Sequence, residues 1–407
     1  MKKWDVIVVG GGAAGMMAAG RAGERGKRVL LLEKNNCLGE KLKITGGGRC
    51  NITNAEFDVH LLLKQYGKAA SFLFSPFSQF GVQSTFDFFQ SKGLPLIIQA
   101  GKRAFPNTER ALDVYKVLEK YVREGSVTIK TGAKTSRIMK ESGKVIGIAT
   151  RECVYEADAV VLATGGSSQP ETGSTGDGFK WLRDIGHTVH MPTPSIVPLA
   201  VSEASIHMLK GVSVSQAKIT FFLNGKKQFS RKGDLLFTHF GISGPVVLNS
   251  SGAVGDLLHA GTVTAIIDFF PESNERDLDD RIKALFEQHK NKTLKNIFSH
   301  IAPQQLLSCM QGVGGETKVH SVTKEQRKIL VCTLKMLPLT ITRLMGLDRA
   351  VVVDGGIDLR EVHNRTMRST LYVNLYIVGD LLHINRPSGG YSLQLCWTTG
   401  WVAGNSV

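Results

Sequence analysis

Val6-Ile7-Val8-Val9-Gly10-Gly11-Gly12-Ala13-Ala14-Gly15 is the stretch of sequence that decides the fold. An apolar strand runs into Gly10, whose missing side chain permits a tight turn, and Gly12 lets the backbone approach a pyrophosphate. Gly15 lets the following helix pack against the strand. The N-terminus of that helix attracts an anion because its first backbone amides are unpaired. The pattern therefore predicts a dinucleotide-binding turn.

A second apolar run, Val29-Leu30-Leu31-Leu32, ends at Glu33. An acid in this place accepts hydrogen bonds from the ribose of a bound dinucleotide. Strand, glycine turn, helix, second strand and acid are all present, so we interpret residues 1–34 as a βαβ unit. A chance glycine-rich turn is the alternative, and the complete spacing makes it the weaker one.

Composition limits the class of protein. The 407 residues suffice for two or three domains, and 42% hydrophobic with 21% charged residues is typical of a globular chain. Asp5 interrupts the apolar start, which argues against a signal peptide, and we interpret the uncharged stretch 387–407 as a buried helix. The six cysteines have neither a CxxC pair nor metal-ligand spacing. We expect a cytoplasmic protein with no metal site and no membrane partner.

The net charge of +15 favours polyanionic partners, so ribosomal RNA is one candidate. Solubility is an equally good explanation of the same charge. The sequence leaves the oligomeric state open.

The chain passes through a second domain and returns. Residues 159–166 form a continuous apolar run that breaks into glycine, as a parallel strand buried on both faces does. Pro192, Pro194 and Pro198 mark the passage into short strands and helices. An apolar strand at 371–378 then runs into Gly379. We predict a nucleotide-binding domain in two parts, 1–192 and 338–407, and an inserted substrate module at 193–337.

Two features favour FAD over NAD. One complete fingerprint is present and no second one is found, so we expect one permanently bound nucleotide. The turn at Thr164-Gly165-Gly166, and an Asp380 carboxylate able to hold ribityl hydroxyls, would bring both parts of the chain to one flavin. An ordinary strand ending in Gly-Asp is the alternative.

Four long strings occur in order along the chain: KLKITGGGRCN at 41–51, TGGS at 164–167 continuing to GSTGDG at 173–178, LFTHFGISGP at 236–245 and SGGY at 388–391. Through them the chain resembles the BaiN-like flavoproteins, a bacterial family of FAD-dependent oxidoreductases. The resemblance implies an α/β fold in which a split Rossmann-like FAD-binding domain carries an inserted β-barrel plus helical module. Activities in that family include dihydrouridine synthesis in ribosomal RNA and oxidation of small amines.

The segment after the last strand departs from the family pattern. The family usually has Gly-Glu with acids three and five residues beyond the Glu, whereas here Gly379-Asp380 is followed by His383, Asn385 and Arg386. Carboxylates near the expected flavin edge are thus replaced by neutral or basic groups. This weakens the attraction of a cationic amine and favours an anionic substrate.

The flavin supplies the hydride chemistry, so the protein must orient it and place the substrate. We expect residues 46–51 to form a wall over the ring. Cys50 is one candidate acid, because hydride addition at carbon 6 of a uracil requires a proton at carbon 5. A buried thiol that only packs is the alternative. His239 is the second candidate acid, and a hydrogen-bonded structural histidine is its alternative.

The residues expected to bind FAD are Gly10, Gly12, Ala13, Ala14, Gly15, Glu33, Lys34, Lys41, Gly48, Arg49, Cys50, Asn51, Ala133, Thr164, Gly165, Gly166, Gly379, Asp380, Gly390 and Ser392. Phenylalanines between 72 and 89, beside several lysines, fit a stacking platform for unpaired bases. Helical spacing such as that of Phe77 and Phe80 fits a core stripe better.

We therefore expect an FAD-dependent oxidoreductase in which NADPH or NADH transiently reduces the flavin, and the flavin then reduces uridine in ribosomal RNA. The alternatives are a flavin-dependent oxidase of a small amine or metabolite, and a non-catalytic flavin-containing RNA-binding factor.

Overall fold

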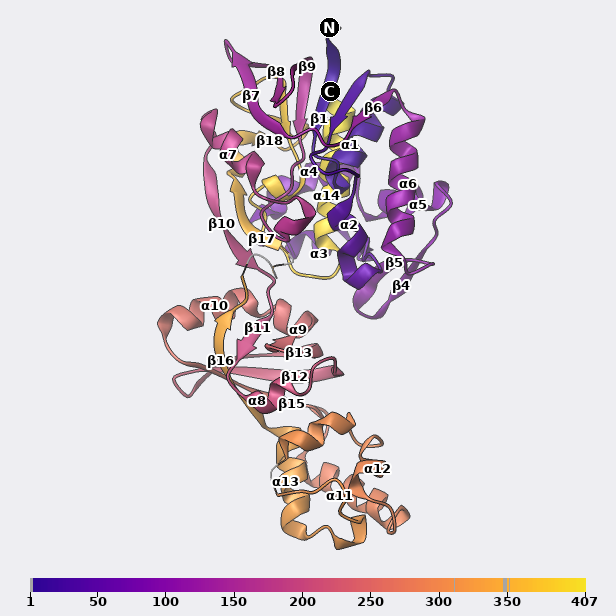
Figure 1. Ribbon diagram of the computed structural model, residues 1–407, viewed down its shortest axis with the longest axis vertical. Helices are drawn as coiled ribbons and strands as arrows, with labels where there is room; N and C mark the ends of the chain where they lie inside the picture. Colours follow the sequence, from indigo (N-terminus) through magenta and orange to yellow (C-terminus); the bar gives the residue numbers. More distant parts are fainter. Residues whose placement is uncertain (1–2, 311, 347–349, 351) are drawn as a thin grey trace. The chain divides into compact units, whose positions relative to one another are not determined.

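The computed structural model describes residues 3–310, 312–346, 350 and 352–407 (Figure 1). The chain divides into two compact units: unit 1 is Met1–Pro194 with Leu347–Val407, and unit 2 is Ser195–Gly346. The first crossing lies beside the predicted boundary at 192/193, and the second lies beyond the one at 337/338. The strand β16 (Leu337–Leu344) accounts for the difference, because it pairs with β11 and β15 inside unit 2.

Unit 1 is built on a sheet that has nine strands within the described residues, in the order β18-β19-β20-β9-β1-β2-β6, with β7 and β8 beside β9. β1 (Trp4–Val9) pairs in parallel with β2 (Val29–Leu32) and β9 (Val154–Leu162). β9 also pairs in parallel with β20 (Leu375–Ile377). The other strands are β6 (Val127–Lys130), β7 (Thr135–Glu141), β8 (Lys144–Thr150), β18 (Val362–His363) and β19 (Arg368–Ser369). The predicted Rossmann-like α/β class is confirmed.

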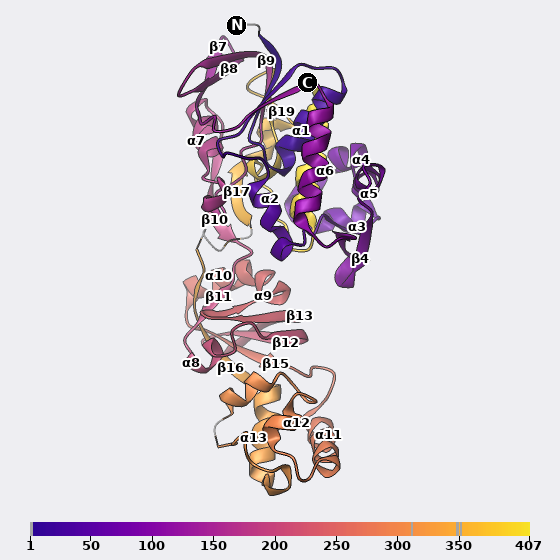
Figure 2. The same cartoon turned by 45° about the vertical axis from the view of Figure 1, so that its right-hand side comes forward.

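Three helices cover one part of this sheet. α1 (Ala13–Glu24) packs against α6 (Ala111–Glu124) and α14 (Tyr391–Ser406), and they lie side by side in Figure 2. Glycine makes the contact with α14 close: a Cβ at Gly400 or Gly404 would lie 2.4 Å from a carbonyl oxygen of α1. Among the described helices, none is long and apolar enough to cross a membrane.

A helical segment and a small sheet complete unit 1. The helices are α2 (Glu40–Ile44), α3 (Val59–Lys64), α4 (Ala70–Gln79), α5 (Val82–Ser91) and α7 (Asp177–Asp184); the strands are β3 (Thr53–Asn54), β4 (Leu96–Gln99) and β5 (Arg103–Pro106), with β10 (Val189–Ser195) paired to β17 (Val352–Ile357). Phe77, Phe80 and Phe89 are buried, which favours the core stripe over the stacking platform.

Three local expectations need correction. The loop predicted over 39–54 contains α2, which begins after Gly39 in the left-handed region at φ +71°. The strand predicted over 371–378 covers only β20, because Asn374 turns its side chain to the carbonyls of Val145 and Asp158. The short strand predicted at 227–229 is part of the long strand β13.

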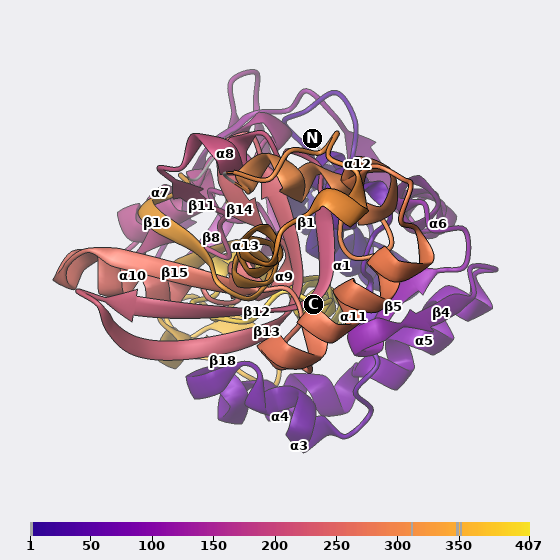
Figure 3. The same cartoon turned by 90° about the horizontal axis from the view of Figure 1, so that it is seen from below.

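Unit 2 contains a closed antiparallel barrel of order β11-β14-β13-β12-β15-β16, whose long strands β12 and β13 run together in Figure 3. The strands are β11 (Leu199–Val201), β12 (Ser213–Leu223), β13 (Lys226–Thr238), β14 (Gly241–Ser243) and β15 (Val263–Asp268); the helices are α8 (Ala204–His207), α9 (Pro245–Leu248), α10 (Ser251–Ala260), α11 (Glu275–Gln288), α12 (Leu294–Phe298) and α13 (Lys324–Lys335). Barrel and helices share one apolar core. The barrel that the resemblance implied is present.

Candidate FAD site

A cavity opens in unit 1 where the parallel strands end. It encloses about 1230 Å³ of empty space, including its open mouth. Val9, Leu32 and Val378, which stand at the carboxyl ends of β1, β2 and β20, line it. This edge is where doubly wound sheets bind nucleotides. The predicted FAD-binding residues that line the cavity are Gly10, Gly12, Ala13, Ala14, Glu33, Lys34, Lys41, Ala133, Thr164, Gly165, Gly379, Asp380 and Ser392.

The N-terminal wall holds its carboxylate with backbone amides. Glu33 accepts hydrogen bonds from the amides of Gly11 at 2.7 Å and Asn35 at 2.8 Å. Burial raises the pKa of Glu33, and the two amides only partly oppose that rise. Each carboxylate oxygen keeps a lone pair for a ribose hydroxyl. Among the described residues no side chain caps α1, so its first amides and the open space at Gly12 suit a pyrophosphate.

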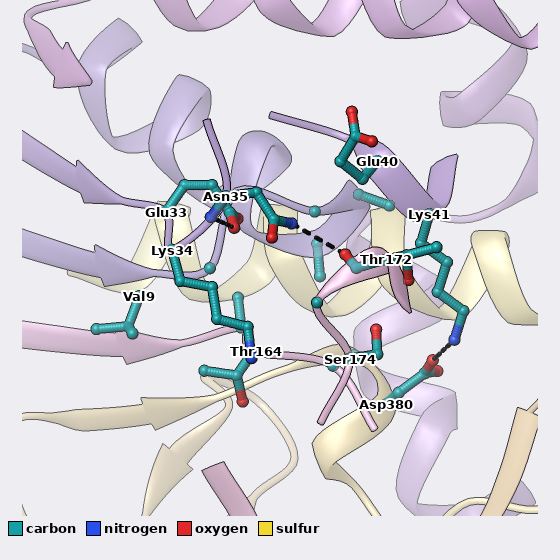
Figure 4. Close-up of a pocket in the computed structure, with 18 of the residues that line it drawn as sticks. Val9, Glu33, Lys34, Asn35, Glu40, Lys41, Thr164, Thr172, Ser174 and Asp380 are labelled. Carbon is teal, nitrogen blue, oxygen red and sulfur yellow. Dashed lines mark hydrogen bonds and ion pairs between the residues drawn. The ribbon is translucent and has the colours of Figure 1, made fainter. Parts of the chain in front are cut away.

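A second wall comes from residues 172–177, which the sequence reasoning did not include among the FAD ligands. The side-chain amide of Asn35 donates to the carbonyl of Thr172 at 2.9 Å, and the Lys34 ammonium donates to Asp177 at 2.9 Å (Figure 4). Thr172, Gly173, Ser174, Thr175 and Asp177 all line the cavity. Their glycine-rich string carried the family resemblance, and this was the signal that could have identified them.

The C-terminal wall holds its carboxylate with cations. Arg386 donates to Asp380, and the Lys41 ammonium lies 3.7 Å from the other carboxylate oxygen (Figure 4). Burial alone would raise the pKa of Asp380, but the charges of Arg386 and Lys41 outweigh burial and lower it. The Arg386 side chain is 1% exposed and also donates to the Ile384 carbonyl at 2.6 Å. This end of the cavity therefore carries one positive charge in excess.

Three predicted glycine ligands do not line the cavity, because each serves close packing. A Cβ on Gly15 would lie 1.8 Å from the Gly10 carbonyl oxygen. A Cβ on Gly390, at φ +102°, would lie 2.2 Å from the Thr53 backbone. Gly166 faces the side chain of Val353 in the same way.

The segment predicted to cover the flavin ring also turns away from the cavity. Thr45 and Leu42 line it, whereas Gly48, Arg49, Cys50 and Asn51 do not. Gly46 and Gly47 adopt left-handed conformations, which redirect the backbone after Thr45. Arg49 donates to Gln99 at 2.6 Å and to Glu109 at 2.5 Å and stacks on Phe105. The structure thus gives Arg49 protein partners.

The two predicted acids lie in different settings. Cys50 is fully buried in the core of unit 1, and burial raises the pKa of its thiol to about 12. That environment fits the packing alternative better than proton donation. His239 lies in unit 2, exposed in the turn between β13 and β14, with its ring against Phe240.

The residues of this cavity fit FAD. Thr135 and Thr164 line it, and their hydroxyl oxygens are buried with no hydrogen-bond partner among the described residues. Buried hydroxyls in this condition favour a polar ligand. Glu33 would hold the ribose, the start of α1 the pyrophosphate and Asp380 the ribityl chain. Bound FAD supplies two-electron transfer; the protein binds it, orients it and sets the local charge.

These features define an FAD-dependent oxidoreductase with a split Rossmann-like domain. The chain belongs to the HI0933-like family, since the family model described as the HI0933-like protein Rossmann domain matches residues 4–406. Among curated relatives, the 3-dehydro-bile acid delta(4,6)-reductase of Clostridium scindens is 30% identical, over 98% of each chain. The ribosomal RNA dihydrouridine synthase of Escherichia coli K12 is 26% identical, over 100% of this chain and 98% of the relative.

Solved structures share the fold at low identity. The chain is similar to 3-ketosteroid delta1-dehydrogenase from Sterolibacterium denitrificans, with a TM-score of 0.55 and 15% identity, covering 100% of this chain and 99% of that one. A flavocytochrome c3 fumarate reductase gives a TM-score of 0.56 at 14% identity, covering 100% and 78%.

Proposed function

We propose that this protein uses bound FAD to reduce a carbon–carbon double bond conjugated with a carbonyl group, and that the substrate is uridine in ribosomal RNA. The observation that carries the proposal is the charge at the C-terminal wall of the cavity. Arg386 and Lys41 outnumber Asp380 there. Excess positive charge stabilises the negative charge that develops on a conjugated carbonyl during reduction, and it repels a cationic amine.

The names of the relatives support the same chemistry. A delta(4,6)-reductase of a 3-dehydro-bile acid removes ring double bonds conjugated with a ketone. A dihydrouridine synthase saturates the uracil double bond, which is conjugated with a carbonyl. In both reactions two electrons and two hydrogens are added across one activated double bond.

The choice of RNA over a small molecule rests on net charge. A charge of +15 attracts a polyphosphate chain far more strongly than it attracts a single carboxylate. The target base would have to be presented unpaired or flipped to reach the cavity. We further propose that NADPH or NADH is a transient electron donor, since the chain has only one nucleotide fingerprint.

The test begins with the flavin of the purified protein reduced without oxygen. Its reoxidation is followed by absorbance after mixing with unmodified ribosomal RNA, with a 3-oxo steroid that has a ring double bond, or with air. RNA in which uridine is replaced by dihydrouridine is the matched control. We expect fast reoxidation by unmodified RNA alone. A response to the steroid but not to RNA would keep the chemistry and overturn the substrate.

Reoxidation by air alone would favour the small-amine oxidase. Stable RNA binding without any reoxidation would favour the non-catalytic factor. The same assay with C50A and H239Q tests the two predicted acids.

A further inference from the structure

Two histidines stack beside the C-terminal wall of the cavity, each held by its own carboxylate. The rings of His190 on β10 and His383 after β20 are 4.3 Å apart between centroids, at an interplanar angle of 36°. The Nε2 atom of His190 lies 3.2 Å from Asp358, and that of His383 lies 3.3 Å from Asp354. A carboxylate at one ring nitrogen fixes the ring and leaves the other nitrogen to exchange a proton.

The second nitrogen of each ring is available. Within the part of the chain that the structure describes, neither Nδ1 atom of this pair has a hydrogen-bond partner, and the side chains of His190 and His383 are 42% and 36% exposed. His187 provides the contrast. Its Nδ1 lies 2.7 Å from Glu361, its Nε2 lies 3.0 Å from Ser369, and its side chain is fully buried. His187 is a structural histidine, whereas the stacked pair can transfer protons.

His383 is the member nearer the cavity. It follows Asp380, which lines the cavity, and its amide donates to the Ile357 carbonyl at 3.1 Å, which fixes it beside β17. Val352 on β17 also lines the cavity, and Asp354 lies on the same face of that strand, since side chains alternate. Two strand residues span roughly 7 Å, so the pair formed by Asp354 and His383 stands at the rim of the cavity.

We propose that His383 is the proton donor of the reduction, acting through Nδ1, and that Asp354 is its positioning residue; this inference rests on the proposed function. A hydride from the reduced flavin forms a C–H bond at the β-carbon, breaks the π bond and leaves an enolate. The protonated ring of His383 then gives its Nδ1 proton to the α-carbon. The substrate gains two electrons, the flavin is oxidised by two, and water returns the proton to the ring.

The charged groups around His383 support a protonated ring. Asp354 faces it directly, and Asp358 holds the stacked His190. Arg360 is the one nearby cation that the structure records on these carboxylates, and it donates to Asp358 rather than to Asp354. Asn385 donates to the remaining oxygen of Asp354 at 3.2 Å and holds that carboxylate in place.

The first test compares H383Q with H363Q, an exposed histidine of unit 1. In H383Q we expect FAD content to be unchanged, and reoxidation by the enone substrate to fall at least about 100-fold, the usual contribution of a general acid. In wild type the rate should fall as pH rises through the pKa of His383, and H383Q should lose that dependence. A wild-type rate in H383Q, or a loss in C50A or H239Q instead, would overturn the inference.

The second test needs no cofactor. NMR of the histidine ring protons in flavin-free protein gives the pKa of His383, and D354N should lower it by roughly one unit because an opposite charge is removed. An unmoved pKa would overturn the positioning role of Asp354. If wild-type flavin is reoxidised by neither RNA nor the steroid, the proposed function itself fails. If it is reoxidised normally in H383Q, only the inference fails.

Discussion

The two walls of the FAD cavity solve the same problem by different means. Each buries a carboxylate, but the N-terminal wall surrounds Glu33 with backbone amides and the C-terminal wall surrounds Asp380 with Arg386 and Lys41. The pKa of Glu33 is consequently raised by burial, whereas that of Asp380 is lowered. The difference teaches that dipoles can orient a buried acid without fully compensating its lost hydration, and that two nearby cations overcompensate it.

Removing the principal cation should have the largest effect. R386M leaves Asp380 buried with only Lys41 nearby, and we expect a loss of about 3–5 kcal/mol in the free energy of unfolding of unit 1. Urea unfolding followed by tryptophan fluorescence measures this selectively, because Trp4, Trp181, Trp397 and Trp401 all belong to unit 1. R360M, at an arginine that is 88% exposed, is the control and should show no resolvable change. Equal losses would contradict the contrast.

Neutralising the other acid should affect ligand binding more than folding. E33Q keeps the shape of the side chain but removes the charge that strengthens hydrogen bonds to ribose hydroxyls. We expect the Kd for FAD to rise roughly 10- to 100-fold. Fluorescence titration of flavin-free protein measures it. Glu40 also lines the cavity but pairs with Lys43, so E40Q is the matched control, and a Kd change as large as that of E33Q would refute the role of Glu33.

Opposite pKa shifts predict opposite dependences of stability on pH. The folded-state pKa of Glu33 is above its ordinary 4.5, so its contribution is complete below pH 4.5 and is lost as pH rises through the raised value. That of Asp380 is below its ordinary 3.8, so its contribution is complete above pH 3.8 and is lost as pH falls through the lowered value.

Urea unfolding of wild type, E33Q and D380N without flavin checks these signs. The advantage of wild type over E33Q should shrink from pH 4.5 to 7, whereas its advantage over D380N should stay constant there and shrink below pH 3.8. Parallel curves for the two variants would show that the walls do not differ.

The smallest effect is expected at the second cation. Lys41 is 26% exposed, lies 3.7 Å from Asp380 and donates to Ser168 at 2.6 Å. Because solvent screens it and Arg386 remains, K41M should cost about 1 kcal/mol or less in unfolding free energy. A loss equal to that of R386M would mean that the two cations contribute equally. K41R, which keeps the charge, should lie close to wild type in the same urea titration.

The contrast between the walls also explains what the sequence could predict. The βαβ unit was predictable because glycine spacing and a terminal acid reflect local geometry, and Gly10, Gly12 and Glu33 line the cavity. The fold class followed from the same pattern. Arg386 was recognised as a departure from the family, but its ion pair with Asp380 was not predictable, since that pair depends on how the chain folds back after Leu382.

Residues 48–51 show the opposite error. Their glycine-rich string is typical of close approach to a ligand, yet consecutive left-handed glycines turn the backbone away from the cavity after Thr45. The stacked histidines were also beyond prediction as a pair, because His190 and His383 are far apart in sequence and meet through the pairing of β10 with β17.

The close packing of α14 on α1 has a consequence for synthesis of the protein. The N-terminal βαβ unit leaves the ribosome first, but β20, Asp380 and the helix that covers α1 emerge only after all of unit 2. At about 5–20 residues per second, the first half of unit 1 waits roughly ten seconds or more for its complement. During that interval unit 2, whose barrel and helices are contiguous in sequence, can fold, while the apolar groove that later receives Gly400 and Gly404 stays uncovered. The nascent chain therefore acquires a complete flavin site only when its last helix is made.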